Sequence, residues 1–307
     1  MTNYHVPVLL KESLDALCLK PGGIYVDATL GGGGHTEAVL KADSSVRVYA
    51  FDQDEDAVAF ASERLSVFND RLFIIESNFS YLRTHLALQR IKKIDGILFD
   101  LGVSSHQLDV MDRGFSFRSE HKLDMRMNRN TEISAYDVVN GYSRADLVRI
   151  FKDYGEERES FSVAKNIEIE RKKGSLETNI QLANLIEKSV KSPLKEKAKA
   201  RIFQALRIEV NQETEVLKKA LKSAVDILNP GGRIAVISYH SLEDGIVKRY
   251  FKEEEINCTC PSKFLKCVCN KKSRLKILTK KPIIPDKSEI AVNSRSRSAK
   301  LRIGVKK

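Results

Sequence analysis

Four short apolar runs alternate with amphipathic stretches in the first third of the chain, and this alternation constrains the fold more than any other feature. The runs are rich in β-branched residues and lie at residues 22–30, 46–52, 71–77 and 94–102. Near-continuous apolar runs are typical of strands buried on both faces, and the amphipathic stretches between them predict helices. The sequence therefore predicts an α/β fold with a doubly wound parallel sheet built from βαβ units.

The strand pattern stops between residues 109 and 199, where apolar residues recur at helical spacing instead. We therefore expect a small all-α insertion domain at 109–199. It would interrupt a single sheet domain made of residues 1–108 and 200–307.

The sheet pattern resumes after the expected insertion. Residues 200–228 predict one long helix or two, "NPGG" predicts a turn, and "RIAVISYH" predicts another buried strand. The tail offers two more candidate strands, "RLKILTKKPI" and "AKLRIGV". The chain after the insertion should therefore complete the sheet that the first third begins.

A run of four glycines follows the first predicted strand, in "DATLGGGGH" at residues 27–35. Ligands of α/β sheets bind outside the carboxyl ends of the strands, and glycines let a ligand approach the backbone there. Neither the phosphate-binding pattern G-x-x-x-x-G-K-[ST] nor the dinucleotide pattern G-x-G-x-x-G is present. A tight turn without a ligand explains such a lone cluster equally well.

Two aspartates lie at the ends of predicted strands. Asp52 lies where a carboxylate accepts hydrogen bonds from ribose hydroxyls, about twenty residues after the glycine turn, although a helix cap is the alternative. Asp100 ends an apolar strand, where a carboxylate is costly to bury without a partner. With no phosphate signature, this combination resembles the S-adenosylmethionine site of class I methyltransferases more than an NAD site.

Longer strings, spread over essentially the whole chain, resemble the bacterial ribosomal RNA cytosine methyltransferase family RsmH/MraW. They include "DATLGGGGHT", "GILFDLGVSSHQLD", "RIFQALRIEVNQE" and "LNPGGRIAVISYHSLEDGIVKRYF". The resemblance implies a class I methyltransferase with S-adenosyl-L-methionine as cofactor. It implies methyl transfer to the exocyclic N4 amine of a cytidine in the decoding region of 16S ribosomal RNA, during small-subunit maturation. It also implies cofactor contacts at Gly33, Gly34, His35, Asp52, Phe79, Asp100 and Gln107.

The catalytic group is less evident than the cofactor contacts. Many amino-methyltransferases carry [DNS]-P-P-[YF] after the fourth strand, whereas this chain has "DLGV". A cytosine amine is a poor nucleophile, so an acceptor for its N–H would help. We predict Asp100 as the catalytic residue. Ser104, Ser105, His106 and His240 are further candidates, and a structural role is the more common one for such histidines.

Charge and composition favour a nucleic-acid partner. Lys and Arg number 52 and Asp and Glu number 41, so the net charge is +11 and the field favours a polyanion. "RGFSFR" and "LDMRMNRN" at the start of the insertion offer arginines for phosphates and aromatics for base stacking, although Phe115 and Phe117 serve equally well as packing residues. We therefore expect the insertion to recognise the substrate, and the partner to be 16S rRNA or the small ribosomal subunit.

Four of the five cysteines lie in "CTCPSKFLKCVC": Cys258, Cys260, Cys267 and Cys269. Two C-x-C pairs separated by six residues fit a tetrahedral zinc site, but the spacing is shorter than that of usual zinc knuckles. Reduced cysteines in a hairpin are the alternative. The sequence does not decide between them, and we assign no metal from it.

The N-terminus has no basic leader or cleavage site, and no uncharged apolar stretch approaches about 18 residues. We therefore expect a cytoplasmic protein without a membrane partner. Two other functions stay open from the sequence: a non-catalytic RNA-binding or assembly factor with a vestigial cofactor fold, and an NAD-dependent oxidoreductase. The oligomeric state, monomer or homodimer, is also open.

Overall fold

A computed structural model describes residues 7–104, 107, 110–260 and 268–307, and these form two compact units. The first unit comprises Met1–Gly102 and Glu215–Lys307, and the second comprises Val103–Thr214. In the described part of the chain, no helix combines the length and apolarity needed to cross a bilayer.

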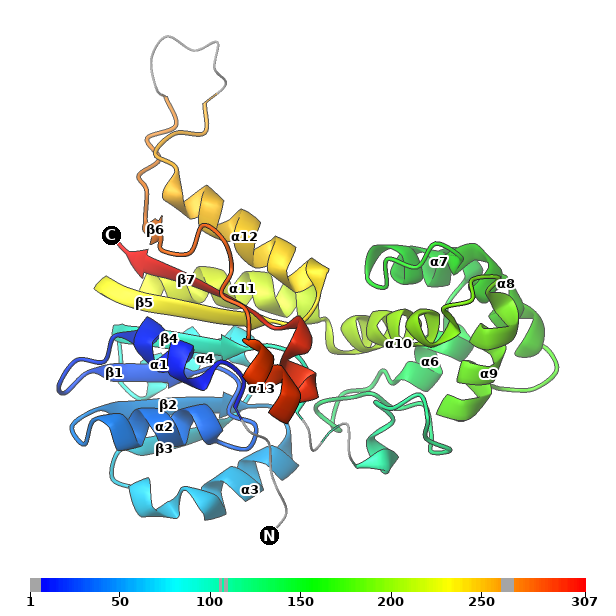
Figure 1. The fold of residues 1–307 in the computed structure, drawn as a ribbon, viewed down its shortest axis with the longest axis horizontal. Helices are drawn as coiled ribbons and strands as arrows, with labels where there is room; N and C mark the ends of the chain where they lie inside the picture. Colours follow the sequence, from blue (N-terminus) through cyan, green and yellow to red (C-terminus); the bar gives the residue numbers. More distant parts are fainter. Residues whose placement is uncertain (1–6, 105–106, 108–109, 261–267) are drawn as a thin grey trace. The chain divides into compact units, whose positions relative to one another are not determined.

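The first unit is built on a seven-stranded sheet with the order β3-β2-β1-β4-β5-β7-β6 (Figure 1). Neighbouring strands from β3 to β5 run parallel, while β7 is antiparallel to both β5 and β6. The fold class is therefore the predicted one, a doubly wound α/β sheet. The strands are β1 Ile24–Asp27, β2 Arg47–Asp52, β3 Leu72–Glu76, β4 Ile94–Asp100, β5 Leu228–Ser238, β6 Leu275–Ile277 and β7 Lys300–Lys306.

All four apolar runs of the first third form strands, and each strand is shorter than its run. One expectation differs, because "NPGG" belongs to β5 rather than to a separate turn. The pairing of β4 with β5 shifts register between Ile94 and Gly96, and Gly231 has φ +79°. The turn residues therefore produce an irregular start of the strand.

Helices cover both faces of the sheet (Figure 1). One apolar core packs α1 Leu10–Leu17, α2 Gly34–Ala42 and α3 Glu55–Arg64 against one face of the sheet. A second core packs α4 Leu82–Leu88, α11 Glu213–Ile227 and α12 Ser241–Glu255 against the other. Burial on both faces explains why the strand runs lack alternation. Shorter elements of the described chain are α13 Lys287–Val292, η1 Ser66–Phe68, η2 Phe79–Tyr81, η3 Met111–Arg113 and η4 Ser294–Ser298.

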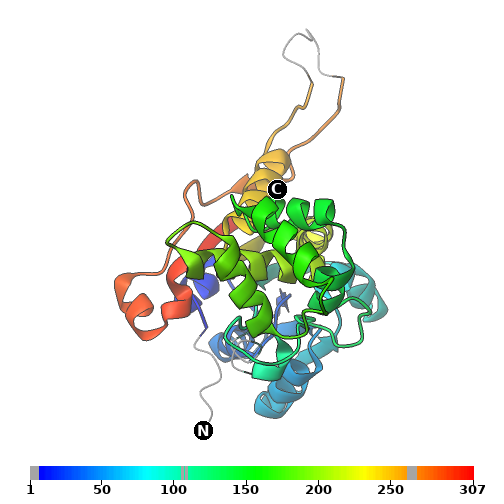
Figure 2. The same cartoon turned by 90° about the vertical axis from the view of Figure 1, so that its right-hand side faces the viewer.

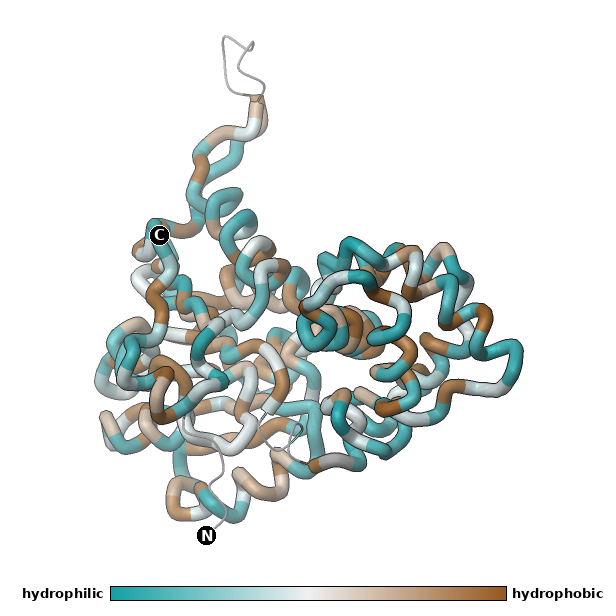
Figure 3. The backbone as a smooth tube through the Cα atoms, turned by 45° about the vertical axis from the view of Figure 1, so that its right-hand side comes forward, coloured by the Kyte–Doolittle hydropathy of each residue, from teal (hydrophilic) through white to brown (hydrophobic). Residues whose placement is uncertain are grey.

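The second unit is helical and has its own apolar core (Figure 2). Its helices are α6 Ala135–Gly141, α7 Arg144–Asp153, α8 Ser160–Glu170, α9 Asn179–Ser189 and α10 Lys195–Asn211. Hydrophilic and hydrophobic positions alternate along these helices, as amphipathic packing around a core requires (Figure 3). Ser134 and Thr178 begin α6 and α9 with capping boxes, which satisfy N–H groups at both helix starts.

The boundaries of the second unit, Val103–Thr214, differ from the expected 109–199. Of the two possibilities that the sequence left open, one long helix or two, the structure has two, α10 and α11, separated by Gln212 in the left-handed conformation at φ 50°. Because α10 contacts α6, α7 and α9, its residues belong to the second unit as a whole. An amphipathic pattern alone does not mark such a break.

Candidate active site

Three aspartates occupy the carboxyl ends of neighbouring strands in the first unit. Asp27 ends β1, Asp52 ends β2 and Asp100 ends β4. From β1 the sheet continues through β2 on one side and β4 on the other, so the strand order reverses there. Such a reversal point is where open α/β sheets bind ligands. The structure therefore brings Asp52 and Asp100 to the edge where the sequence predicted a cofactor.

Asp52 ties the glycine turn to the end of β2. Its Oδ2 accepts a hydrogen bond from the Gly31 N–H at 2.8 Å, and its Oδ1 accepts one from the Asp54 N–H at 3.0 Å. The N-cap role that the sequence left open for Asp52 belongs instead to Asp54, whose side chain accepts from the Asp56 N–H. Asp52 is thus available to a ligand as well as to the turn.

The protonation of Asp52 depends on its surroundings. Burial raises the pKa of the Asp52 carboxyl to about 6, against the two backbone N–H groups that lower it. Each carboxylate oxygen can accept a second hydrogen bond besides the one from its backbone N–H. Hydroxyl groups of a ribose are donors of this kind, so the site fits a nucleoside.

Gly33 and Gly34 are required by protein packing. Gly33 has φ +77°, and a Cβ there would lie 2.7 Å from Leu65 Cδ1. A Cβ on Gly34 would lie 2.3 Å from Pro7 Cγ. By contrast, a Cβ on Gly31 would meet only the Thr29 carbonyl oxygen at 4.0 Å, although φ is +49°. The open side of the turn is therefore at Gly31. Gly33 and Gly34 remain candidates for cofactor contact only through their backbone atoms.

Asp100 is held by three groups of the first unit. The Tyr239 hydroxyl donates to Asp100 Oδ1 at 2.7 Å, and the Asp100 N–H donates to Thr29 Oγ1 at 2.7 Å. His35 Nε2 lies 3.5 Å from Asp100 Oδ2, an ion-pair distance that is too long for a strong hydrogen bond. Burial and the charge of Asp100 raise the pKa of Tyr239 well above its usual value, so the phenol remains a donor.

His35 is buried between two carboxylates. Burial lowers the pKa of His35, but the contact with Asp100 and the charges of Asp100 and Asp27 outweigh it and raise the pKa overall. Asp27 accepts hydrogen bonds from Thr36 Oγ1 at 2.7 Å and from the Thr29 N–H at 3.1 Å. Burial raises the pKa of Asp27 in turn. His35 thus links the start of α2 to the ends of β1 and β4.

Phe79 lies in η2, in the loop after β3. Its ring meets Phe99 of β4 edge to face, with centroids 5.6 Å apart at 84°. The Ser77 N–H donates to the Asp52 carbonyl oxygen at 2.7 Å, and Asn78 donates to Gln53 Oε1 at 2.7 Å. These contacts fix the loop beside the end of β2, where an aromatic ring can form an apolar wall for a base.

The other residues that the sequence predicted for the site are not among those described above at the carboxyl ends of β1, β2 and β4. His240 is the N-cap of α12: its Nδ1 accepts from the Glu243 N–H at 3.4 Å and its Nε2 lies 3.1 Å from Glu243 Oε1. Gln107 is buried in the second unit, where it accepts from the Ser104 N–H and its own N–H donates to Ser104 Oγ. Ser105 and His106 lie outside the described residues.

Several residues at this edge had no prediction from the sequence: Asp27, Thr29, Thr36 and Tyr239. The signal for Tyr239 was its place immediately after β5, which ends at the same edge of the sheet as β4. Asp27 ends β1 just as the predicted aspartates end their strands. Position at a strand end therefore carried more information than residue type.

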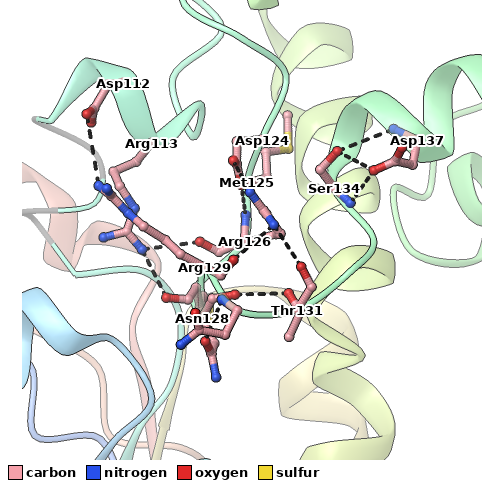
Figure 4. Close-up of polar contacts among 12 residues, drawn as sticks. Asp112, Arg113, Asp124, Met125, Arg126, Asn128, Arg129, Thr131, Ser134 and Asp137 are labelled. Carbon is pink, nitrogen blue, oxygen red and sulfur yellow. Dashed lines mark hydrogen bonds and ion pairs between the residues drawn. The ribbon is translucent and has the colours of Figure 1, made fainter.

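The arginines of the second unit's first loop order that loop (Figure 4). Arg113 is buried and donates to the Arg126 carbonyl oxygen at 3.2 Å. The Arg126 side chain makes two hydrogen bonds to Asp124, at 2.9 and 2.8 Å, and donates to the carbonyl oxygens of Arg129 and Thr131. These two arginines therefore have a structural role in the loop.

A hollow of about 220 Å³ lies within the second unit. Phe115, Phe117, Phe203 and Arg207 are among its lining residues. The rings of Phe117 and Phe203 meet edge to face with centroids 5.8 Å apart. Phe115 also belongs to the apolar core, so both uses foreseen for these aromatics, packing and a binding surface, fit the structure.

The sheet order with its antiparallel β7, the glycine turn and Asp52 define a class I methyltransferase, a class that binds a nucleoside cofactor at this edge. The particular family follows from comparison with known proteins. The chain belongs to the MraW methylase family, which matches residues 2–307.

Named relatives support the family assignment. The chain is 49% identical to "Ribosomal RNA small subunit methyltransferase H" of Carboxydothermus hydrogenoformans over 98% of this chain and 97% of that protein. It is 47% identical to the protein of the same name in Clostridioides difficile, over 100% of both. A putative methyltransferase from Streptococcus mutans, solved in complex with SAH, has a TM-score of 0.46 at 14% identity, with 99% of this chain and 100% of that chain covered. This structural similarity is low, so the assignment to the methyltransferase class rests on the strand order and on the family match.

The family confirms the enzyme class and the predicted cofactor. The chain is a methyltransferase, and its cofactor is S-adenosyl-L-methionine. The open glycine at Gly31 and the hydrogen-bond capacity of Asp52 fit the nucleoside part of that cofactor. The NAD-dependent oxidoreductase considered from the sequence is incompatible with this family.

Proposed function

We propose that the chain transfers a methyl group from S-adenosyl-L-methionine to the exocyclic N4 amine of a cytidine in the decoding region of 16S ribosomal RNA. The names of its relatives support small-subunit ribosomal RNA as the substrate. The observation that carries the proposal is the position of Asp100, an aspartate at the end of β4 held by Tyr239 and Thr29. The reaction would be a step of small-subunit maturation in the cytoplasm.

Different residues would contact different parts of the cofactor. Asp52 would accept the ribose hydroxyls, and Phe79 would provide an apolar wall for adenine. Gly33, Gly34 and His35 would contact the ligand at the start of α2, where the first N–H groups lack helical partners. Gln107 in the second unit is a further contact implied by the family resemblance.

Asp100 would act on the target amine. The cofactor supplies an electrophilic methyl group on a sulfonium. The lone pair of a cytosine amine is delocalised into its ring, so a carboxylate that accepts an N–H hydrogen bond orients the amine and increases its electron density. The same carboxylate would accept the proton that the amine loses. Tyr239 would hold the carboxylate of Asp100 in the required orientation, as a positioning residue, and Thr29 would anchor the backbone N–H of Asp100.

The second unit would recognise the RNA. A base within folded RNA must leave its stack to be methylated, and aromatic side chains are common partners for such bases. The hollow lined by Phe115, Phe117 and Phe203 offers aromatic groups for this purpose. The net charge of +11 favours association with RNA or with the assembled subunit.

Substitution of Asp100 tests the proposal. We expect Asp100→Ala to reduce methyl transfer to small-subunit particles by about a hundredfold or more, which is the usual contribution of a positioned acid–base group. Asp70→Ala, which removes an exposed aspartate, is the matched control and should retain full activity. Unchanged turnover in a folded Asp100→Ala protein would remove Asp100 from the catalytic site.

Calorimetry separates the enzyme from a non-catalytic assembly factor. The wild-type chain should bind S-adenosyl-L-methionine with measurable heat, and NAD should give none. If millimolar S-adenosyl-L-methionine also gave no heat, a binding module with a vestigial cofactor fold would be the better account. Asp52→Ala should weaken binding of S-adenosyl-L-methionine, because the ribose hydroxyls lose their acceptor.

A further inference from the structure

Three cysteines meet in the connection between α12 and β6, which contains none of the residues of the proposed reaction. The ligand atoms of Cys258, Cys260 and Cys269 all lie within 4.8 Å of one another. The described parts of this connection run side by side beyond the end of α12 (Figures 1 and 2). Cys267 lies outside the described residues, so the argument rests on the other three.

The separation of two of these sulfurs fits a shared metal ion. Cys258 Sγ and Cys269 Sγ are 3.8 Å apart. Two thiolates about 2.3 Å from one zinc ion at the tetrahedral angle would also be about 3.8 Å apart. A disulfide would require a distance of about 2.0 Å. The geometry therefore corresponds to two ligands of one ion.

Backbone N–H groups point at all three sulfurs. The Thr259 N–H donates to Cys269 Sγ at 3.4 Å, the Cys260 N–H donates to Cys258 Sγ at 3.4 Å, and the Val268 N–H donates to Cys260 Sγ at 3.3 Å. A metal-bound thiolate carries negative charge, and such donors complement it. These hydrogen bonds are a second observation, independent of the clustering, that favours a metal site.

Apolar packing contributes little to this segment. Val268 is 67% exposed and Cys258 is exposed, and none of the three apolar cores includes a described residue between 256 and 274. Polar contacts hold the base of the connection, where the Arg274 N–H donates to the Glu254 carbonyl oxygen at 2.8 Å. A segment without a core commonly needs a covalent or metal cross-link to keep one conformation.

We propose that Cys258, Cys260 and Cys269 bind a structural zinc ion that holds together the two sides of this connection. Thiolate ligands favour zinc among the common divalent ions, and the site needs no role in methyl transfer. On binding, each thiol releases its proton to the solvent and the sulfur donates an electron pair to the ion, with no change of oxidation state. The zinc would stabilise the connection between α12 and β6.

Metal analysis of the full-length protein tests this proposal. Protein purified under reducing conditions from zinc-supplemented cells should contain about one zinc per chain by inductively coupled plasma mass spectrometry. Cys258→Ser and Cys269→Ser should each lower the bound zinc by about threefold or more, because a hydroxyl is a poor replacement for a thiolate. The matched control is Cys18→Ser, which replaces an exposed cysteine at the end of α1 and should retain the zinc.

A second measurement uses the wild-type protein alone, so it does not require that any variant folds. Cobalt added to the metal-free wild-type protein should give a sulfur-to-cobalt charge-transfer band, and chelation should speed proteolysis between α12 and β6. The proposal is overturned if the wild-type protein holds less than about a tenth of a zinc per chain. It is also overturned if iron or copper takes the place of zinc, if Cys18→Ser loses as much zinc as Cys258→Ser, or if the three cysteines prove to be oxidised.

Discussion

Tyr239 fixes one oxygen of Asp100, and this contact is specific enough to test. The hydroxyl donates to Asp100 Oδ1 at 2.7 Å, which leaves Oδ2 facing His35 at 3.5 Å. A carboxylate held on one side has a defined orientation for a substrate on the other. Under the proposed mechanism, Tyr239 matters for turnover more than for cofactor binding.

Removal of this hydroxyl should therefore slow the reaction. A hydrogen bond to a charged group contributes about 1.5–3 kcal/mol, so we expect Tyr239→Phe to lower kcat for methyl transfer by about tenfold or more. The Kd for S-adenosyl-L-methionine should stay within about twofold, since the ring remains. Parallel calorimetry and turnover assays give this comparison. Equal losses in kcat and in affinity would show a general structural role instead.

If Asp52 binds the ribose as proposed, cofactor binding should depend on pH. Its pKa is raised to about 6, so the carboxyl gains a proton as the pH falls through that value and loses acceptor capacity for ribose hydroxyls. One such proton should raise the Kd for S-adenosyl-L-methionine about tenfold between pH 7 and pH 5. Calorimetry across this range measures the effect.

Asp52→Asn provides the control for this pH dependence. The amide does not titrate, so the Kd of this variant should be higher at pH 7 and should change less than that of the wild type down to pH 5. His35 also has a raised pKa, and its contribution remains in the variant. A wild-type Kd that does not change between pH 7 and pH 5 would contradict the assignment of Asp52 to the ribose.

At the scale of elements, the glycine turn joins β1, β2 and α2. Gly31 donates to Asp52 at the end of β2, while Gly33 and Gly34 approach Leu65 and Pro7. Neighbouring glycines thus meet different requirements: an open backbone at Gly31, and close packing at Gly33 and Gly34. From the sequence we expected the cofactor to contact Gly33 and Gly34, whereas the structure packs these two glycines against Leu65 and Pro7 and leaves Gly31 open.

Gly33→Ala should destabilise the fold. The new Cβ would clash with Leu65 Cδ1 at 2.7 Å, and φ +77° disfavours alanine, so we expect a loss of about 1–3 kcal/mol in unfolding free energy. Leu65→Ala in the same chain should remove the clash but not the backbone strain. Denaturant unfolding of both single variants and the double variant measures the coupling. Strictly additive effects would contradict the contact as the cause.

The sequence predicted the first four strands well, because burial on both faces leaves long apolar runs. It also placed Asp52 and Asp100 at one edge, since parallel strands end on the same side. It did not reveal that Tyr239 donates to Asp100, because the two residues are distant in sequence and meet only through the pairing of β4 with β5. It left open whether residues 200–228 form one helix or two, since the break at Gln212 depends on one backbone conformation.

At the scale of the whole molecule, the chain combines two units with separate cores. The first unit carries Asp52, Asp100 and the glycine turn, and the second carries Gln107 and the aromatic hollow. Separate cores allow each unit to be built for one task, cofactor chemistry in the first and RNA recognition in the second. This division remains our proposal for how one chain methylates a base in a large RNA.

The most direct test of the central claim is a map of modified cytidines in 16S ribosomal RNA. Nucleoside mass spectrometry would compare cells that lack this protein with the same cells carrying wild-type protein, Asp100→Ala or Asp70→Ala. We predict that N4 methylation of a decoding-region cytidine is lost without the protein, restored by the wild type and by Asp70→Ala, and not restored by Asp100→Ala. N4 methylation that persists in cells lacking the protein would contradict the account.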